Sequence, residues 1–138
     1  MTTRVLVMGI VGGHVMALAS GAALSYIVLR LIEPASLERW VDRGVPRALV
    51  VVQISVGAFV TWMFIGLVLA SAYLAGNFAE DPGALGSPSV TFTAIVVALA
   101  FLPLPPLILL WRRPWWLWCG LSGLFAAFFG WLLPLSGE

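Results

Sequence analysis

The chain has few charged residues for its length, and its basic residues are all of one type. Of its 138 residues 9% are Asp, Glu, Lys or Arg, and all seven basic residues are arginines because lysine is absent. A soluble domain averages about 25% charged and about 45–50% apolar residues. With 62% hydrophobic residues and a mean hydropathy of +1.06, this chain cannot cover a water-facing surface, which predicts an integral membrane protein.

The sequence is equally poor in residues that hold metals or move protons. Its single cysteine, Cys119, excludes an intrachain disulfide and a multi-cysteine metal cluster within one chain. Its single histidine, His14, lies in a long apolar run, and none of these runs contains Asp, Glu, Lys or Arg. Because no acid or second histidine lies in the runs, we expect neither an enzyme nor a metal centre.

Four apolar runs are long enough to cross a bilayer, which takes about 20 helical residues. Backbone groups in hydrocarbon must be satisfied within the segment, so each run is predicted to be a helix. The first run continues ten residues past Ala17-Leu18-Ala19, a pattern that resembles a signal cleavage site, so we expect it to be retained. Residues 1–138 are therefore predicted to form one all-α transmembrane domain, a bundle of four transmembrane helices at about 5–29, 48–75, 89–111 and 115–135.

The arginines lie almost entirely in two of the links between these helices. On the opposite side of the predicted membrane the only arginine is Arg4, and the link at 76–88 contains Glu80 and Asp81 but no basic residue. Cytoplasmic loops carry an excess of arginine and lysine. Both termini are therefore predicted to lie outside and the arginine-bearing links in the cytoplasm, most simply at a prokaryotic plasma membrane; these arginines are Arg30, Arg39, Arg43, Arg47, Arg112 and Arg113.

The first arginine-bearing link has the pattern of a short amphipathic helix at about 35–43. Leu37, Trp40 and Val41 fall at helical spacing on one face, whereas charged residues take the other, and Ser36 can cap the start. This pattern favours a helix lying in the headgroup region with Trp40 as its anchor, over a solvated turn.

A cluster of tryptophans surrounds the second arginine-bearing link. Arg112-Arg113-Pro114 predicts a tight turn, which makes the helices on either side an antiparallel hairpin. Indole rings favour the membrane–water interface, so the cluster is interpreted as an aromatic belt rather than a ligand cage. The belt residues are Trp111, Trp115, Trp116 and Trp118.

Three prolines lie close together in the third run, at Pro103, Pro105 and Pro106. Each removes a backbone donor and clashes with the preceding turn, so the last third of this helix is predicted to kink or partly unwind. Such breaks can form substrate sites in transporters. Few polar side chains lie nearby to complete an ion site, which favours a structural kink.

Small residues recur at every fourth position of the first run, in a series that we call the small-residue ladder. Such a series lets another backbone approach closely, which is the usual basis of helix association in lipid. The fourth run has a weaker counterpart in Ser122, Ala126 and Gly130, and the second run offers Gly66 and Ala70, so the helix that the ladder packs against stays open. We therefore expect the first helix to be the most tightly packed one, through Gly9, Gly13, Ala17, Gly21 and Ser25.

His14 lies within about 60° of Ala17 on a helical wheel, which predicts that it faces the packed side near the bilayer centre. A backbone carbonyl, Gln53, Ser55 or Thr61 is a possible hydrogen-bond partner. Packing is the favoured role. A lone histidine can also bind haem shared between two copies, or a chlorophyll-type magnesium, so the cofactor stays open.

The favoured function is a non-catalytic structural or accessory subunit. Its expected partners are the lipid bilayer and other membrane chains or copies of itself, without nucleic acid. The first alternative is a small oligomeric transporter or channel, with a path near His14 and the break at Pro103–Pro106. The second alternative is a subunit that binds haem or chlorophyll through His14.

Overall fold

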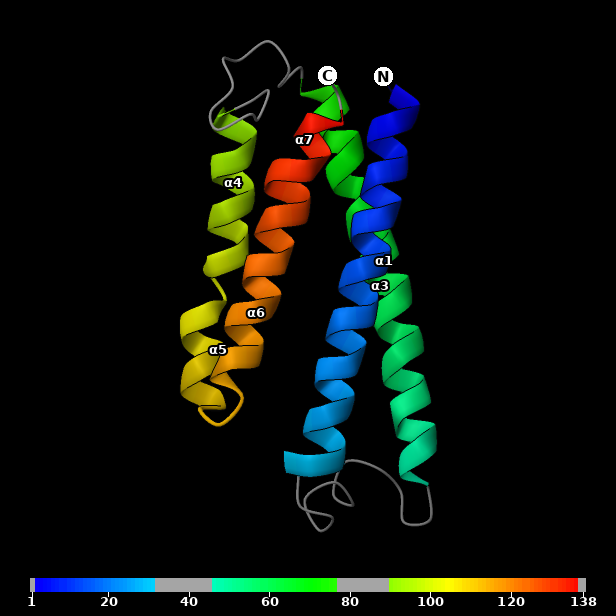
Figure 1. Ribbon diagram of the computed structural model, residues 1–138, viewed down its shortest axis with the longest axis vertical. Helices are drawn as coiled ribbons and strands as arrows, with labels where there is room; N and C mark the ends of the chain where they lie inside the picture. The colour runs from blue at the N-terminus through cyan, green and yellow to red at the C-terminus, as the bar shows by residue number, and fades with distance from the viewer. Residues whose placement is uncertain (1, 32–45, 77–89, 137–138) are drawn as a thin grey trace.

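The computed structural model describes residues 2–31, 46–76 and 90–136 (Figure 1). Two antiparallel helical hairpins make up this part of the chain. The first consists of α1 (Thr2–Tyr26), which ends in the π-helical turn η1 (Ile27–Leu31), and α3 (Arg47–Ala75). The second runs through α4 (Val90–Phe101), α5 (Leu104–Leu110), α6 (Trp115–Phe125), the π-helical segment η3 (Ala126–Leu132) and α7 (Leu133–Leu135).

Four helices in the described ranges are long and apolar enough to cross a membrane, at Thr3–Arg30, Arg47–Ala75, Val90–Leu110 and Trp115–Leu135. The prediction of a helical chain with four long apolar helices is confirmed for these ranges, which contain no strand. The expected interfacial helix at 35–43, with Arg39, Trp40 and Arg43, lies outside the described residues.

The two helices of the first hairpin touch backbone to backbone. A Cβ atom added to Gly9 would lie 2.6 Å from the Gly66 carbonyl oxygen, and one added to Gly13 would lie 2.6 Å from that of Trp62. No side chain larger than hydrogen fits at either place without a shift of the main chain. The contact between α1 and α3 therefore depends on the glycines of the small-residue ladder and on Gly66.

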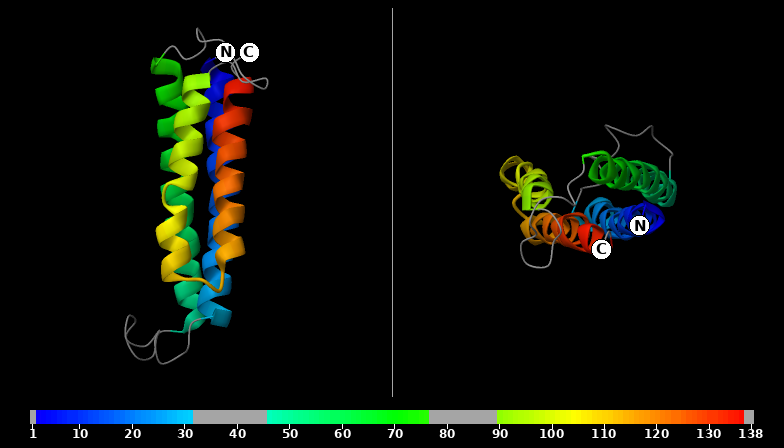
Figure 2. Two further views of the ribbon diagram at one scale, coloured as in Figure 1. Left: turned by 90° about the vertical axis from the view of Figure 1, so that its left-hand side faces the viewer. Right: turned by 90° about the horizontal axis from the view of Figure 1, so that it is seen from above.

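The second hairpin contains the break that the prolines predict. Leu102 and Pro103 form a turn between α4 and α5, although the Leu102 amide still donates to the Ala98 carbonyl at 2.9 Å. Beyond the turn, Leu107 donates to the Pro103 carbonyl at 3.2 Å, which restores the helix. Since α5 then continues in much the same direction as α4, the break offsets this helix rather than reversing it (Figure 2).

The helices form an open arc rather than a closed square, with α1 and α6 in the middle and α3 and α4 at the two ends (Figure 2). Gly12 joins the hairpins, because its missing side chain leaves room for the Phe129 ring, 3.1 Å from an added Cβ. At the end that holds both termini, Tyr73 of α3 meets Phe92 of α4 with ring centroids 5.0 Å apart. This ring contact joins the two outer helices, α3 and α4, at the end of the molecule that holds both termini.

One side-chain hydrogen bond joins the two helices of the second hairpin. The Thr93 hydroxyl of α4 donates to the Gly130 carbonyl at 2.8 Å. Gly130 lies in the π-helical segment η3, after which the Leu133 amide donates five residues back, to the Phe128 carbonyl. The bond from Thr93 therefore ties α4 to η3.

Replacing Thr93 by valine is expected to lower the free energy of unfolding by about 0.6–2 kcal/mol, the range for hydrogen bonds between membrane helices. The shape of the side chain is kept, but the Gly130 carbonyl loses its donor. Reversible unfolding in detergent micelles measures the change. The matched control is Thr91→Val, at an exposed position of the same helix. Equal destabilisation by both substitutions would show that the bond to Gly130 is unimportant.

Candidate functional site

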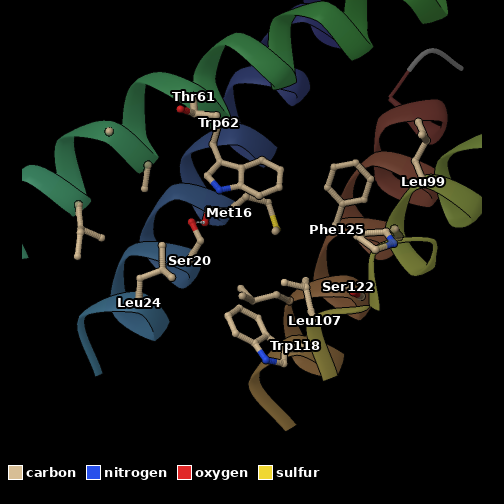
Figure 3. A pocket seen from close by; sticks show the side chains of 16 residues that line it. Met16, Ser20, Leu24, Thr61, Trp62, Leu99, Leu107, Trp118, Ser122 and Phe125 are labelled. Carbon is tan, nitrogen blue, oxygen red and sulfur yellow. Dashed lines mark hydrogen bonds between the residues drawn. The ribbon is translucent and has the colours of Figure 1, made fainter. Parts of the chain in front are cut away.

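A cleft of about 510 Å³ lies between α3 and the α4–α5 helix. Its floor is formed by α1 and α6, so all four long helices contribute to it (Figure 3). It exists because Tyr73 and Phe92 join α3 to α4 at one end only, and because Pro103 offsets the helix on the other wall. Gly57 and Ala58 widen the cleft by presenting almost no side chain.

The walls of the cleft are mainly apolar and contain a few hydroxyl groups. Ser20 on the floor uses its hydroxyl to donate to its own helix, at 2.6 Å from the Met16 carbonyl oxygen. Thr61 and Ser122 add hydroxyls on α3 and α6. Trp62 projects over the upper part, where its ring meets Phe125 with centroids 5.7 Å apart. The cleft therefore suits a largely hydrocarbon molecule.

Trp118 forms the floor near the turn between α5 and α6. Its side chain is 7% exposed and stacks on Trp111, with ring centroids 6.1 Å apart and planes at 7°. Its indole N–H is buried and has no hydrogen-bond partner. Figure 3 shows this nitrogen on the ring edge that points away from Met16 and Trp62. An unpaired buried donor costs about 1–3 kcal/mol, so this edge would gain from an acceptor.

Four of the five described arginines lie at one end of the molecule. Arg30 is in η1, Arg47 begins α3, and Arg112 and Arg113 form the turn between α5 and α6. These segments share the end of the bundle opposite to the two termini, whereas Arg4 begins α1 at the other end (Figure 1). The described ranges contain no Asp or Glu; the link between η1 and α3, which lies outside them, contains Glu33, Glu38 and Asp42.

The prediction that His14 faces the packed side is wrong. His14 is exposed, and its ring meets the edge of Phe59 on α3 with centroids 5.5 Å apart. Among the described residues, His14 therefore contacts Phe59 and not one of the predicted polar side chains. Of those side chains, Ser55 uses its hydroxyl to donate to the Val51 carbonyl at 2.8 Å. The physical reason is that glycine contacts make a narrow interface, and His14 lies about 100° from Gly13 on the wheel.

The remaining predicted residues fall into separate places. Of the ladder, Ala17 and Gly21 are buried and Ser25 is half-buried. Pro103 lines the cleft, whereas Pro105 and Pro106 are exposed. Trp111, Trp115 and Trp116 are exposed and Trp118 is buried, so the four tryptophans do not share one environment. No group of three or more His, Cys, Asp or Glu that could hold a metal occurs among the described residues.

Sequence reasoning missed the cleft itself. It singled out Pro103 and Trp118 for other reasons, and it noted Thr61 only as a possible hydrogen-bond partner of His14. Gly57 and Met16 gave no signal at all, because a gap between helices has no pattern in a single sequence. Two tryptophans and three hydroxyl residues in otherwise apolar runs were the available clue.

Comparison with known proteins yields no match: no family model, curated protein or solved structure is similar to this chain.

Proposed function

We propose that this chain is an integral membrane protein that acts as a non-catalytic accessory subunit, packing against other membrane chains or copies of itself. The observation that carries the proposal is the small contact area of α3. Only 6% of its most apolar 18-residue window is buried, compared with 44% for the helix that begins at Thr3. A long apolar helix held along one narrow glycine seam leaves most of its surface for lipid or for another chain.

The face of α3 that is turned away from α1 has the side chains that a helix partner requires. Val56, Val60 and Phe64 are all more than half exposed and recur at every fourth residue. Rows of this spacing form the ridges that pack into the grooves of a facing helix. The transporter alternative has weaker support, because His14 is not among the residues that line the cleft beside Pro103.

Association is tested by placing a photo-crosslinking amino acid at Phe64, with Leu18 of α1 as the matched control. The two side chains are 69% and 66% exposed. We expect a discrete product at the mass of a dimer or a fixed complex from position 64 and none from position 18. Native mass spectrometry of the membrane extract then gives the stoichiometry. A lone monomer, with no discrete product from position 64, would contradict the accessory role.

The proposed orientation places the arginine end in the cytoplasm of a prokaryotic cell and both termini outside. Single cysteines at Ser136 and Arg113, in a Cys119→Ser background, test it with a thiol reagent that does not cross membranes. In intact cells we expect Ser136→Cys to react and Arg113→Cys to react only after permeabilisation. The reverse pattern would show that the protein is inserted the other way.

A further inference from the structure

The rim of the cleft is open to the surroundings of the protein. Gly57, Thr61, Leu99 and Pro103 all line the cleft and are all exposed. We propose that the cleft binds one acyl chain of an anionic phospholipid, whose phosphate lies against Arg112 and Arg113. This proposal rests on the membrane insertion proposed above and adds a specific ligand to it.

The body of the cleft matches a hydrocarbon chain. Its volume of about 510 Å³ falls within the range of roughly 300–1,000 Å³ that is usual for ligand sites. Leu24, Ile54 and Leu107 give it apolar walls near the arginine end. The Ser20 hydroxyl donates its hydrogen to the Met16 carbonyl, so this hydroxyl needs no hydrogen-bond acceptor from a ligand.

The headgroup end is defined by charge. Leu107 and Trp118 line the cleft on either side of the turn that carries Arg112 and Arg113, so this turn lies beyond one end of the cleft, although neither arginine lines it. Both arginines are exposed. No Asp or Glu of the described residues is there to pair with them. An arginine guanidinium can bind a phosphate through two parallel hydrogen bonds. Two such arginines favour an anionic headgroup over a zwitterionic one, because the zwitterionic headgroup also carries a positive charge.

Trp118 connects these two parts of the site. It lies three residues into α6, about 4.5 Å along the helix axis from Trp115. Its unpartnered N–H is on the ring edge turned away from the deeper cleft residues (Figure 3). In a phospholipid the ester carbonyl lies between the phosphate and the acyl chain. Because the indole nitrogen is buried, that carbonyl would supply the missing acceptor only after the side chains that cover the nitrogen shift.

Native mass spectrometry with phosphatidylglycerol and phosphatidylcholine of identical chains tests the headgroup preference. We expect protein purified from membranes to bind phosphatidylglycerol about tenfold or more tightly, since two arginines contribute. The double variant Arg112→Gln/Arg113→Gln is expected to lose this preference. Equal affinity of the unaltered protein for both lipids would overturn the proposal. Recovery of the protein from the soluble fraction would instead contradict membrane insertion itself.

Two glycine variants test whether the chain lies in the cleft. An added Cβ would meet no atom within 4 Å at either Gly57 or Gly123, so a side chain can begin at both positions without a main-chain clash. Only Gly57 lines the cleft. Gly57→Leu is therefore expected to weaken binding of both lipids roughly tenfold, whereas Gly123→Leu leaves it unchanged. Equal binding by the two variants would show that lipid is held at the arginines alone, which overturns the cleft site.

Tryptophan fluorescence gives a measure that does not depend on altering the cleft volume. Phosphatidylglycerol brominated along its chain is expected to quench the unaltered protein more than the variant Trp62→Phe/Trp118→Phe, which lacks both cleft tryptophans. Trp118→Phe alone is expected to weaken binding of both lipids several-fold, because both have ester carbonyls. Equal fractional quenching of the unaltered protein and the double variant would overturn the assignment.

Discussion

Replacing Gly66 by alanine is expected to lower the free energy of unfolding by about 1–3 kcal/mol, the usual cost of overpacking a tight contact. The substitution adds a single methyl group, but this Cβ would collide with the carbonyl oxygen of Gly9. Because that neighbour is main chain, α1 and α3 must move apart to make room. Reversible unfolding in detergent micelles, followed by circular dichroism, measures the change.

The matched control is Gly57→Ala, nine residues earlier on the same helix. An added Cβ meets nothing within 4 Å there, so the substitution is expected to be neutral or to stabilise by roughly 0.5–1 kcal/mol through helix propensity. Opposite signs for the same chemical change would isolate the glycine contact from any general effect of alanine. Similar changes at both positions would mean that the α1–α3 seam contributes little.

Replacing Phe129 by alanine is expected to cost about 2–4 kcal/mol. Phe129 is fully buried, touches Gly12 of α1 and packs on Phe125 with ring centroids 5.1 Å apart. Truncation leaves a void between the two hairpins, and lost dispersion contacts account for the loss. In soluble cores the same substitution usually costs about 3–5 kcal/mol. We expect a smaller loss here, because unfolding in detergent leaves the Phe129 ring in an apolar environment and does not transfer it to water.

Phe101→Ala is the control for this prediction, since Phe101 is 43% exposed at the end of α4. Its loss is expected to be under about 1 kcal/mol, because no void forms. Unfolding of both variants in the same detergent gives the comparison. Equal losses would indicate that the hairpins are held together elsewhere than at Phe129.

The helices and the close-packing face of α1 could be predicted from the sequence because both depend on local patterns. The apolar runs fix the helices through length and composition. The spacing of Gly9 and Gly13 marks one face of α1, and Gly66 with Ala70 marks one face of α3. The sequence did not decide which helix packs on this face of α1, because the fourth run offered a second series of small residues at Ser122, Ala126 and Gly130.

The cleft and the place of His14 could not be predicted, because they depend on angles between helices. The periodicity of a sequence gives the direction of each side chain on its own helix, but not the width of the contact. The α1–α3 interface is narrow at Gly13, so His14 falls outside it although it shares a face with Ala17. A kink at Pro103 was predicted, but its direction was not. The direction of the kink decides whether a gap opens between α3 and the α4–α5 helix.

The contact of Tyr73 with Phe92 links α3 to α4 at the end that holds the termini. Neither ring lines the cleft, whose rim includes the exposed residues Gly57, Thr61, Leu99 and Pro103. In the membrane arrangement proposed above, a bound molecule would therefore exchange sideways with the surrounding lipid. Passage between α3 and α4 toward the termini would require the two rings to separate.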